Sequence, residues 1–409
     1  MPRVAIIDSV RTGISRAFHG RLRSMRPDDM AAHCVDALLA RNPWLDPGRV
    51  DDCVIGCAFP EGPQGMNLGR NVAVLSRLGR DTAGLTISRY CASGLDAVAH
   101  AACRIASGQA ETMVAGGVES ISMTLKSINS SSLFNPAIRE RSPGTYVNMA
   151  IDTPSIPFWK RAIRSMGETA EIIARREQIA RTVQDRYAWT SQVRVARAQQ
   201  AGVFSDEIVP ITATIGDGTD GPQARVVVDG DDCNRPDTTP EALAGLEPSF
   251  HGSGSVTAGN AAPPADGASC MLLASEAVVE REELDVLGWF TGYATVGCDP
   301  EVMAVGAAHA IQKLLASHRL APDDIDLYEI NEVFAAQILY CLSVLKLDEA
   351  RVNVNGGALS VGHPFGMTGA RLVGHVAREL ERRDRTLGMV SMCVGGGIGA
   401  AALIERSAA

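Results

Sequence analysis

Short apolar runs alternate with amphipathic segments along the first 120 residues of the chain. The runs are typical of buried strands, and the segments between them repeat apolar residues at helical spacing. Strands that alternate with helices in this way predict a layered α/β fold. The predicted strands are Val4–Asp8, Asp52–Cys57, Thr86–Tyr90 and Thr112–Gly116, and the predicted helices are Asp28–Leu39, Val72–Leu78 and Ser93–Ser107.

The pattern changes between residues 121 and 255. Ser, Asn, Pro and Arg dominate Ser127–Ser155, and a long charged helical pattern covers Thr169–Gln200. Long insertions in compact enzymes often form binding loops, although a plain surface excursion is the simpler interpretation. We expect residues 121–255 to form a loop domain inserted into the α/β core.

The strand and helix alternation returns after this insertion. Residues 1–120, completed by about 256–275, would form one α/β half, and residues 276–409 the other. Residues 87–118 and 354–394 share an order of strand, reactive residue, amphipathic helix and Gly-flanked strand, which predicts two copies of one unit. Segments that follow matching strands would meet, so we expect Cys91 and His363 to face one cleft. Further predicted strands are Val286–Thr291, Asp324–Glu329, one ending at Asn353–Asn355, Leu387–Cys393 and Ala400–Ile404; helices are Val302–His318, Val333–Leu345 and Gly369–Leu380.

Composition narrows the classes of function. The chain has 409 residues with 38 Lys and Arg against 47 Asp and Glu, a net charge of −9, which argues against nucleic acid or an anionic membrane as the main partner. A local basic patch for an anionic small ligand remains open at Lys160, Arg161 and Arg164, where a solvated surface is the alternative. The uncharged stretch Leu387–Ile404 contains a run of glycines, so we expect two strands there and no membrane span.

Ten cysteines are spread along the chain without any C-x-x-C pair. No His pair stands at zinc-ligand spacing, so we expect neither a metal site nor a disulfide framework. The N-terminus lacks the basic and apolar regions of a signal peptide. These features together favour a reducing, cytoplasmic location.

Four residues carry the candidate chemistry. Cys91 stands between a predicted strand and helix, where the helix dipole favours a thiolate, although a buried inert cysteine is the simpler alternative. His363 lies in a Gly- and Pro-rich segment as a potential base or a structural histidine, and Asn331 ends a strand as a potential hydrogen-bond donor or helix cap. Cys393 precedes three glycines whose N–H groups could serve an oxyanion. The G-x-G-x-x-A pattern at 397–402 is rejected as a dinucleotide site, because a strand is predicted there.

These segments together resemble the thiolase family. The shared motifs are Cys-x-Ser at 91–93, Asn-Glu-x-Phe at 331–334, Gly-His-Pro at 362–364 and Cys-x-Gly at 393–395, and the similarity extends over essentially the whole chain. The resemblance implies duplicated α/β halves packed as a layered αβαβα core with an inserted loop domain. It also implies exchange of acyl groups between 3-ketoacyl-CoA, CoA and acetyl-CoA, by a homodimer or homotetramer. Coenzyme A would be a substrate, with no tightly bound cofactor and no metal.

The resemblance also implies roles for individual residues. Cys91 would be the nucleophile that becomes S-acylated, and His363 would take its proton. Cys393 would move a proton on and off the acetyl α-carbon or the CoA thiol. Asn331 would fix a water that stabilises the enolate-like oxygen, and the backbone N–H groups of Cys91 and Gly395 would form the second oxyanion hole. In the CoA-binding loop domain, Arg235 would contact the adenine, and Met166, Phe250 and Phe334 would line the pantetheine and acyl channel.

The chain departs from the family pattern near the expected pocket. Ala262 and Ala265 replace a serine and an asparagine, Ser165 stands where short-chain biosynthetic members often have His, and Ala92 replaces Gly. These differences favour a broad or degradative 3-ketoacyl-CoA thiolase over an acetoacetyl-CoA-specific acetyltransferase. Three rivals stay open: a decarboxylating ketosynthase, which would have His in place of Cys393; a silent CoA or lipid carrier; and a metal or redox protein.

Overall fold

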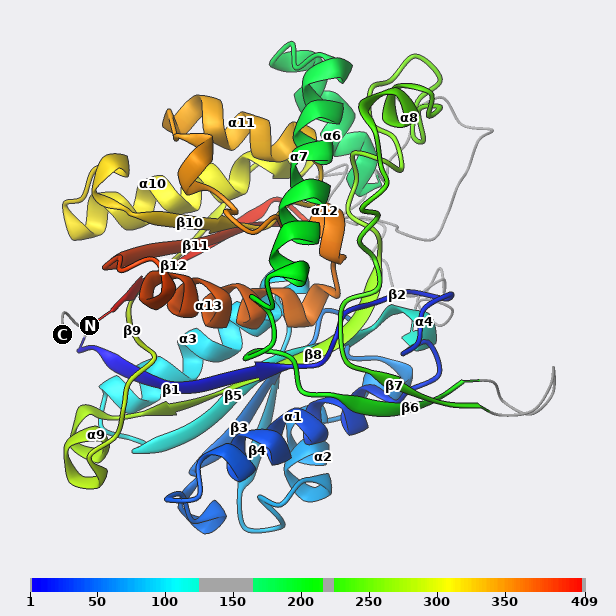
Figure 1. Cartoon of the computed structure of the whole chain (residues 1–409). Coiled ribbons are helices and arrows are strands. Elements are labelled where there is room, and N and C mark those ends of the chain that lie inside the picture. Colours follow the sequence, from blue (N-terminus) through cyan, green and yellow to red (C-terminus); the bar gives the residue numbers. More distant parts are fainter. Residues whose placement is uncertain (1, 125–164, 216–223, 407–409) are drawn as a thin grey trace, which may run out of the picture.

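The computed structural model describes residues 2–124, 165–215 and 224–406 (Figure 1). The candidate basic patch at Lys160, Arg161 and Arg164 lies outside these residues. The strands are β1 (Val4–Arg11), β2 (Ser15–Arg16), β3 (Asp52–Gly56), β4 (Ala83–Ile87), β5 (Thr112–Ser120), β6 (Ile211–Ile215), β7 (Ala224–Val228), β8 (Ala265–Ala274), β9 (Gly288–Gly297), β10 (Leu327–Ile330), β11 (Leu387–Val394) and β12 (Ile398–Glu405). The helices are α1 (Pro27–Arg41), α2 (Leu68–Leu75), α3 (Ser93–Ala106), α4 (Ile121–Thr124), α6 (Met166–Arg176), α7 (Arg181–Gln200), α8 (Pro240–Ala244), α9 (Glu276–Glu282), α10 (Gly306–His318), α11 (Ala335–Leu345), α12 (Ala358–Val361) and α13 (Phe365–Arg382).

The main sheet uses one connection pattern twice. In the first half, β8 lies antiparallel between β1 and β5, and β3 and β4 extend from β5 in parallel. In the second half, β12 lies antiparallel between β9 and β11, and β10 pairs in parallel with β11. The halves join where the start of β1 pairs with β9. This repetition confirms the predicted duplicated α/β fold.

Helices separate and cover the two halves of the sheet. Helices α3 and α13 pack against each other between the halves, as Figure 1 shows. Helices α1 and α2 cover the outer side of the first half, and α10, with α11 beside it, covers the second. Helix α13 buries Leu372, Val376 and Leu380, spaced four residues apart on one face, and each such side chain contributes roughly 1.5–3 kcal/mol of burial. The layers therefore follow the predicted αβαβα order.

Some predicted elements are wrong in extent or type. The pattern over Thr169–Gln200 forms two helices, α6 and α7, because Gln178 adopts a left-handed conformation with φ 53°. No strand ends at Asn353–Asn355: Val352 makes only an isolated bridge to Tyr328, and Asn353 turns the chain with φ 46°. Bounds also shift in the first half: β4 ends at Ile87 instead of Tyr90, and α2 runs Leu68–Leu75 instead of Val72–Leu78. In the second half, α10 begins at Gly306 after a short 3₁₀ segment at Pro300–Val305. There β9 runs Gly288–Gly297 instead of Val286–Thr291, β10 runs Leu327–Ile330 instead of Asp324–Glu329, and α13 runs Phe365–Arg382 instead of Gly369–Leu380.

The part of the chain that the structure describes contains no helix that combines the length and the apolar character needed to cross a membrane. The uncharged stretch Leu387–Ile404 forms β11 and β12, paired antiparallel through the turn at residues 395–397, as predicted. The strand Ile398–Glu405 also bears out the rejection of a dinucleotide motif there, since that motif requires a helix. The limits predicted for the loop domain and the two halves stay a prediction.

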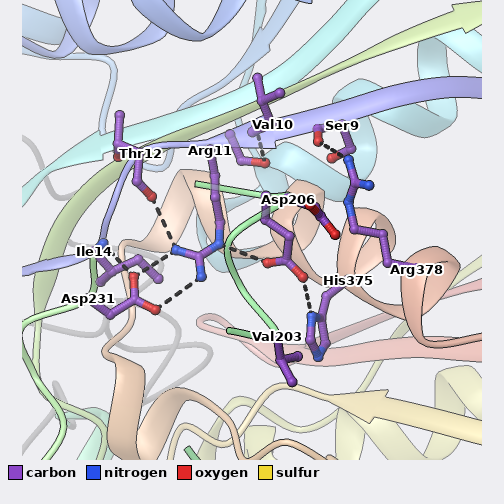
Figure 2. Close-up of polar contacts among 12 residues, drawn as sticks. Ser9, Val10, Arg11, Thr12, Ile14, Val203, Asp206, Asp231, His375 and Arg378 are labelled. Atoms are coloured by element: carbon purple, nitrogen blue, oxygen red, sulfur yellow. Dashed lines mark hydrogen bonds and ion pairs between the residues drawn. The ribbon is translucent and has the colours of Figure 1, made fainter. Parts of the chain in front are cut away.

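A buried ion network attaches the insertion to the core (Figure 2). Arg11 on β1, 1% exposed, donates from Nη1 to Asp231 Oδ1 at 2.7 Å and from Nε to Glu207 Oε2 at 3.0 Å. The other oxygen of Glu207 meets His375 of α13. Burial disfavours the charged carboxylate, but His375 and Arg11 outweigh it and hold the pKa of Glu207 well below its ordinary value. The network therefore depends on a complete set of buried charges.

Replacing Arg11 by methionine is expected to lower the free energy of unfolding by about 3–5 kcal/mol, because it leaves Asp231 and Glu207 buried without their cation. Urea unfolding near neutral pH measures the change. The matched control is Arg281→Met, which removes an exposed cation paired with Glu111 and should leave stability nearly unchanged. Equal stability of the two variants would contradict the buried network as described.

Candidate active site

Close backbone contacts at glycines bring the starts of α3 and α13 together. Gly94 lies in the first turn of α3, and Gly366 in the first turn of α13. A Cβ on Gly94 would lie 2.5 Å from the Gly366 carbonyl oxygen, and a Cβ on Gly117 of β5 only 1.9 Å from it, so only glycine permits this approach. Cys91 and His363 each precede one of these helix starts. The predicted meeting of Cys91 and His363 thus follows from the close packing of α3 and α13.

Cys91 lies in a buried turn between β4 and α3. The residue before it, Tyr90, has φ 44°, a conformation in the left-handed region. The Cys91 side chain is 5% exposed, and its sulfur accepts a hydrogen bond from the backbone N–H of Gly395. Burial raises the pKa of the Cys91 thiol to about 12, with the Gly395 N–H opposing and the charge of Glu119 adding to the rise. The group is therefore a thiol at neutral pH, and a base is needed to activate it.

Cys393 occupies the same buried region from the other half of the molecule. It lies near the end of β11, which packs against the Cys91 turn, and both thiols belong to one buried cluster. Burial raises the pKa of Cys393 well above its ordinary value, and the neighbouring Cys91 raises it further. The structure thus brings the two predicted sulfurs together. All ten cysteines of the chain are free thiols.

His363 is held as a neutral base. Its Nδ1 lies 2.7 Å from the hydroxyl of Thr368, which donates its own proton to the Pro364 carbonyl at 2.8 Å. Nδ1–H is therefore the donor, and Nε2 keeps the lone pair, which accepts from Asn331 Nδ2 at 3.2 Å. Burial, and then the charge of Arg371, lowers the pKa of His363 to about 3. The imidazole is neutral across the physiological range, with Nε2 as its basic atom.

Asn331 places an amide beside this base. It follows β10, and its backbone N–H donates to the Ser391 carbonyl on β11 at 2.9 Å. Its Oδ1 is buried and has no hydrogen-bond partner among residues 2–124, 165–215 and 224–406. A buried amide oxygen of this kind is a ready acceptor for a substrate or solvent group. Asn331 and His363 therefore place a buried amide and a neutral imidazole in contact with each other.

A cavity of about 440 Å³ leads to His363 from the insertion side. All four residues predicted to contact CoA line it, namely Arg235, Met166, Phe250 and Phe334. Phe250 and Phe334 meet edge to face with their ring centroids 6.2 Å apart. Met166 begins α6, which Ser165 and Glu168 cap reciprocally. Cys91 is not part of the cavity wall, which ends at His363 and Phe365.

Sequence reasoning missed other residues of this wall. Arg16 of β2 and the apolar Leu243 and Leu246 also line the cavity, and no motif marked them. Ala262 and Pro264, in the stretch that departs from the family pattern, form part of the wall as well. The Pro263 carbonyl accepts the backbone N–H of His363 at 3.0 Å, so this stretch also positions the base. The wall next to His363 is therefore largely apolar.

Comparison with known proteins identifies the family of this chain. The thiolase N-terminal domain matches residues 4–277, and the thiolase C-terminal domain matches residues 284–406. The chain belongs to the thiolase family. It is 38% identical to a 3-ketoacyl-CoA thiolase of Bacillus subtilis (strain 168), over 99% of this chain and 100% of the relative. It is 40% identical to a beta-ketoadipyl-CoA thiolase of Pseudomonas knackmussii, over 98% of this chain and 99% of the relative.

Solved structures agree with this assignment. The acetyl-CoA acetyltransferase of Bacillus anthracis superposes with a TM-score of 0.86 at 35% identity, covering 99% of both chains. Human mitochondrial 3-ketoacyl-CoA thiolase superposes with a TM-score of 0.85 at 32% identity, again over 99% of both chains. The protein is thus an enzyme with the thiolase fold.

Proposed function

We propose that this protein is a 3-ketoacyl-CoA thiolase, which cleaves 3-ketoacyl-CoA with CoA to acetyl-CoA and a shortened acyl-CoA, reversibly. The observation that carries the proposal is the buried Cys91 thiol, which is bonded by the Gly395 N–H and lies beside Cys393. The turn that holds Cys91 packs against α13, the helix that follows the neutral His363. The names of the relatives support the same reaction, and degradation of fatty acids is the use that we propose for it.

In the first half-reaction, His363 Nε2 takes the Cys91 proton while the sulfur attacks the 3-keto carbon. The N–H groups of Cys91 and Gly395 stabilise the resulting oxyanion. The bond between C2 and C3 then breaks, which leaves an S-acyl-Cys91 and the enolate of acetyl-CoA. His363 and a water held by Asn331 stabilise the enolate oxygen, and Cys393 gives its proton to C2.

In the second half-reaction, Cys393 takes the proton of the CoA thiol, and the CoA sulfur attacks the acyl group on Cys91. The Cys91 sulfur leaves and recovers its proton from His363, so every group returns to its starting state. We propose that CoA is a substrate and that no resident cofactor takes part, since the chain supplies the nucleophile, both proton carriers and the oxyanion donors.

Thiolysis rates across a series of 3-ketoacyl-CoA chain lengths test the proposal. We expect cleavage of medium and long chains as well as acetoacetyl-CoA, because Ala262 and Pro264 make the cavity wall apolar. Activity confined to acetoacetyl-CoA would favour the alternative, an acetoacetyl-CoA-specific acetyltransferase. A protein that binds acyl-CoA without acylation of Cys91 would instead be a silent carrier.

Two cations at the cavity should contact the polar end of CoA. Arg16 and Arg235 are the two cations on a wall that is otherwise mostly apolar in the described part of the chain. We expect Arg16→Met or Arg235→Met to raise the KM for CoA about tenfold, with little change in kcat, since a charged hydrogen bond contributes about 1.5–3 kcal/mol. The control is Arg77→Met, which alters an exposed cation outside the cavity. An unchanged KM in both variants would remove these arginines from the CoA site.

A second copy of the chain is the partner that we propose. Among the described strands, β4 pairs with β3 alone and so lies at the sheet edge, and none of its residues is fully buried. Apolar side chains stand exposed near this edge, including Met66 at 93% and Leu75 at 52%. Such an edge invites pairing with an identical strand. Sedimentation should give a dimer or tetramer that Leu75→Glu weakens, and a monomeric wild type would contradict the proposal.

We also propose a cytoplasmic location. Ten free thiols, most of them buried, match a reducing compartment. Cell fractionation tests this, and recovery from an oxidising compartment would contradict it.

A further inference from the structure

Glu119 is a buried carboxylate next to the active site that the mechanism above does not use. It lies near the end of β5 and is 0% exposed. Its Oε2 accepts the backbone N–H of Ala58 at 2.9 Å and of Gly366 at 2.8 Å, and its Oε1 accepts Gln64 Nε2 at 2.6 Å. One side chain thus joins three segments: β5, the loop after β3 and the start of α13.

The contact with Gly366 caps a long helix. The first N–H groups of any helix lack partners within it, and the N-cap residue before α13, Pro364, offers no side-chain cap. Glu119 supplies the acceptor from a different strand, with its negative charge at the positive end of the helix dipole. His363 immediately precedes this capped turn, so the position of the base depends on where Glu119 holds α13.

The contact with Ala58 extends the same anchor to the other side of the site. The ring of Phe59, the next residue, meets Phe365 edge to face with centroids 5.9 Å apart, and Phe365 in turn lies 5.0 Å from the His363 ring. Phe59 also contacts the ring of Tyr90, the neighbour of Cys91, at 6.2 Å. Residues around both the base and the nucleophile therefore rest on the loop that Glu119 fixes.

We propose that Glu119 is a positioning residue for the thiolase reaction: its carboxylate clamps the first turn of α13 to the loop at Ala58, which sets His363 against Cys91. The predicted effect of Glu119 on turnover rests on the proposed function. The predicted effect of Glu119 on the reactivity of Cys91 does not, because alkylation of a thiol requires no thiolase chemistry.

The charge of Glu119 provides a readout that a purely structural contact would not give. Burial raises the pKa of Glu119 to about 7, and hydrogen bonds from Gln64 and the backbone oppose the rise, so the group is mostly ionised above about pH 7. That charge raises the pKa of Cys91. The thiol of Cys57 faces Glu119 Oε1 at 4.0 Å, and Cys393 is the thiol beside Cys91. Neutralising Glu119 should therefore lower the pKa of Cys91.

Glu119→Gln is the decisive variant. The amide oxygen can keep both backbone N–H bonds of Oε2, while the charge and the bond to Gln64 are lost. We expect the pH profile of Cys91 alkylation by iodoacetamide to move to lower pH, and kcat for thiolysis to fall at least several-fold with the KM for CoA within twofold. Glu119→Ala, which also removes the cap, should lower kcat by about 10–100-fold, comparable to other losses of positioning.

The matched control is Asp52→Asn, which neutralises a carboxylate at the opposite end of β3, where it pairs with Arg104. It should change neither the alkylation profile nor kcat. An alkylation profile and kcat of Glu119→Gln equal to wild type would overturn the proposal. Absence of thiolysis in the wild-type protein would refute only the proposed function, because the shift in Cys91 alkylation would still test the positioning role of Glu119. If Glu119→Ala does not fold, the test rests on Glu119→Gln.

Stability supplies a further check on the buried carboxylate. The pKa of Glu119 in the folded protein lies above its ordinary value, so its contribution to stability is complete at acidic pH and is lost as the pH rises through about 7. Glu119→Gln removes this dependence. We expect the Tm of Glu119→Gln to rise relative to that of the wild type between about pH 5 and pH 8. A difference in Tm that stays constant over this range would mean that the carboxylate is solvated.

Discussion

Replacing Cys91 by alanine should abolish thiolysis, with kcat reduced about 10⁴-fold or more. No other thiol can take its place, because Cys393 is the proton carrier and lacks the Gly395 N–H bond that holds the Cys91 sulfur. The alanine only shortens the Cys91 side chain, which is 5% exposed, so the variant should fold. Loss of 3-ketoacyl-CoA in the presence of CoA measures the effect.

The control for this experiment is Cys103→Ala, which removes an exposed cysteine on α3, the helix that follows the nucleophile. It should retain wild-type turnover. A Cys91→Ala protein with full activity, purified free of other thiolases, would end the assignment of the nucleophile and with it the proposed mechanism.

Replacing Cys393 by alanine should separate the two half-reactions. Proton transfer by a positioned side chain contributes about 10²–10⁴-fold, so turnover should fall by that factor. Cys91 and His363 keep their geometry, since the alanine only shortens a buried side chain at the end of β11. Acyl-CoA should therefore still acylate Cys91, and the acyl-enzyme should persist because CoA is no longer deprotonated.

Intact mass after incubation with acyl-CoA detects this intermediate. The double variant with Cys91→Ala should show no added mass, which locates the acyl group on the nucleophile. Full turnover by Cys393→Ala would contradict the proton-carrier role.

Much of the fold could be predicted from local pattern. Apolar runs predict the strands, and apolar residues such as Leu95 and Val98 at helical spacing predict α3, because burial selects these periods regardless of the partner. The internal repeat predicted that Cys91 and His363 face one cleft. The structure packs their two helices together, but only His363 lines the cavity. Errors arose where backbone conformation decides, because Gln178 and Asn353 adopt positive φ. Glutamine carries no signal for this conformation, whereas asparagine is enriched in it, so Asn353 is the turn that the sequence could have indicated.

By itself, the sequence determined the α/β class, the duplication and the family, and it indicated the four residues to which we assign the chemistry, since these depend on period, order and short motifs. Only the tertiary structure decided the tautomer of His363, the cavity wall at Arg16 and the clamp at Glu119. These features depend on contacts between residues far apart in the chain, such as the bond of Glu119 to Gly366. The local pattern of apolar residues predicts which face of a helix or strand is buried. Only the packing of the folded chain determines which residues from distant segments contact that face.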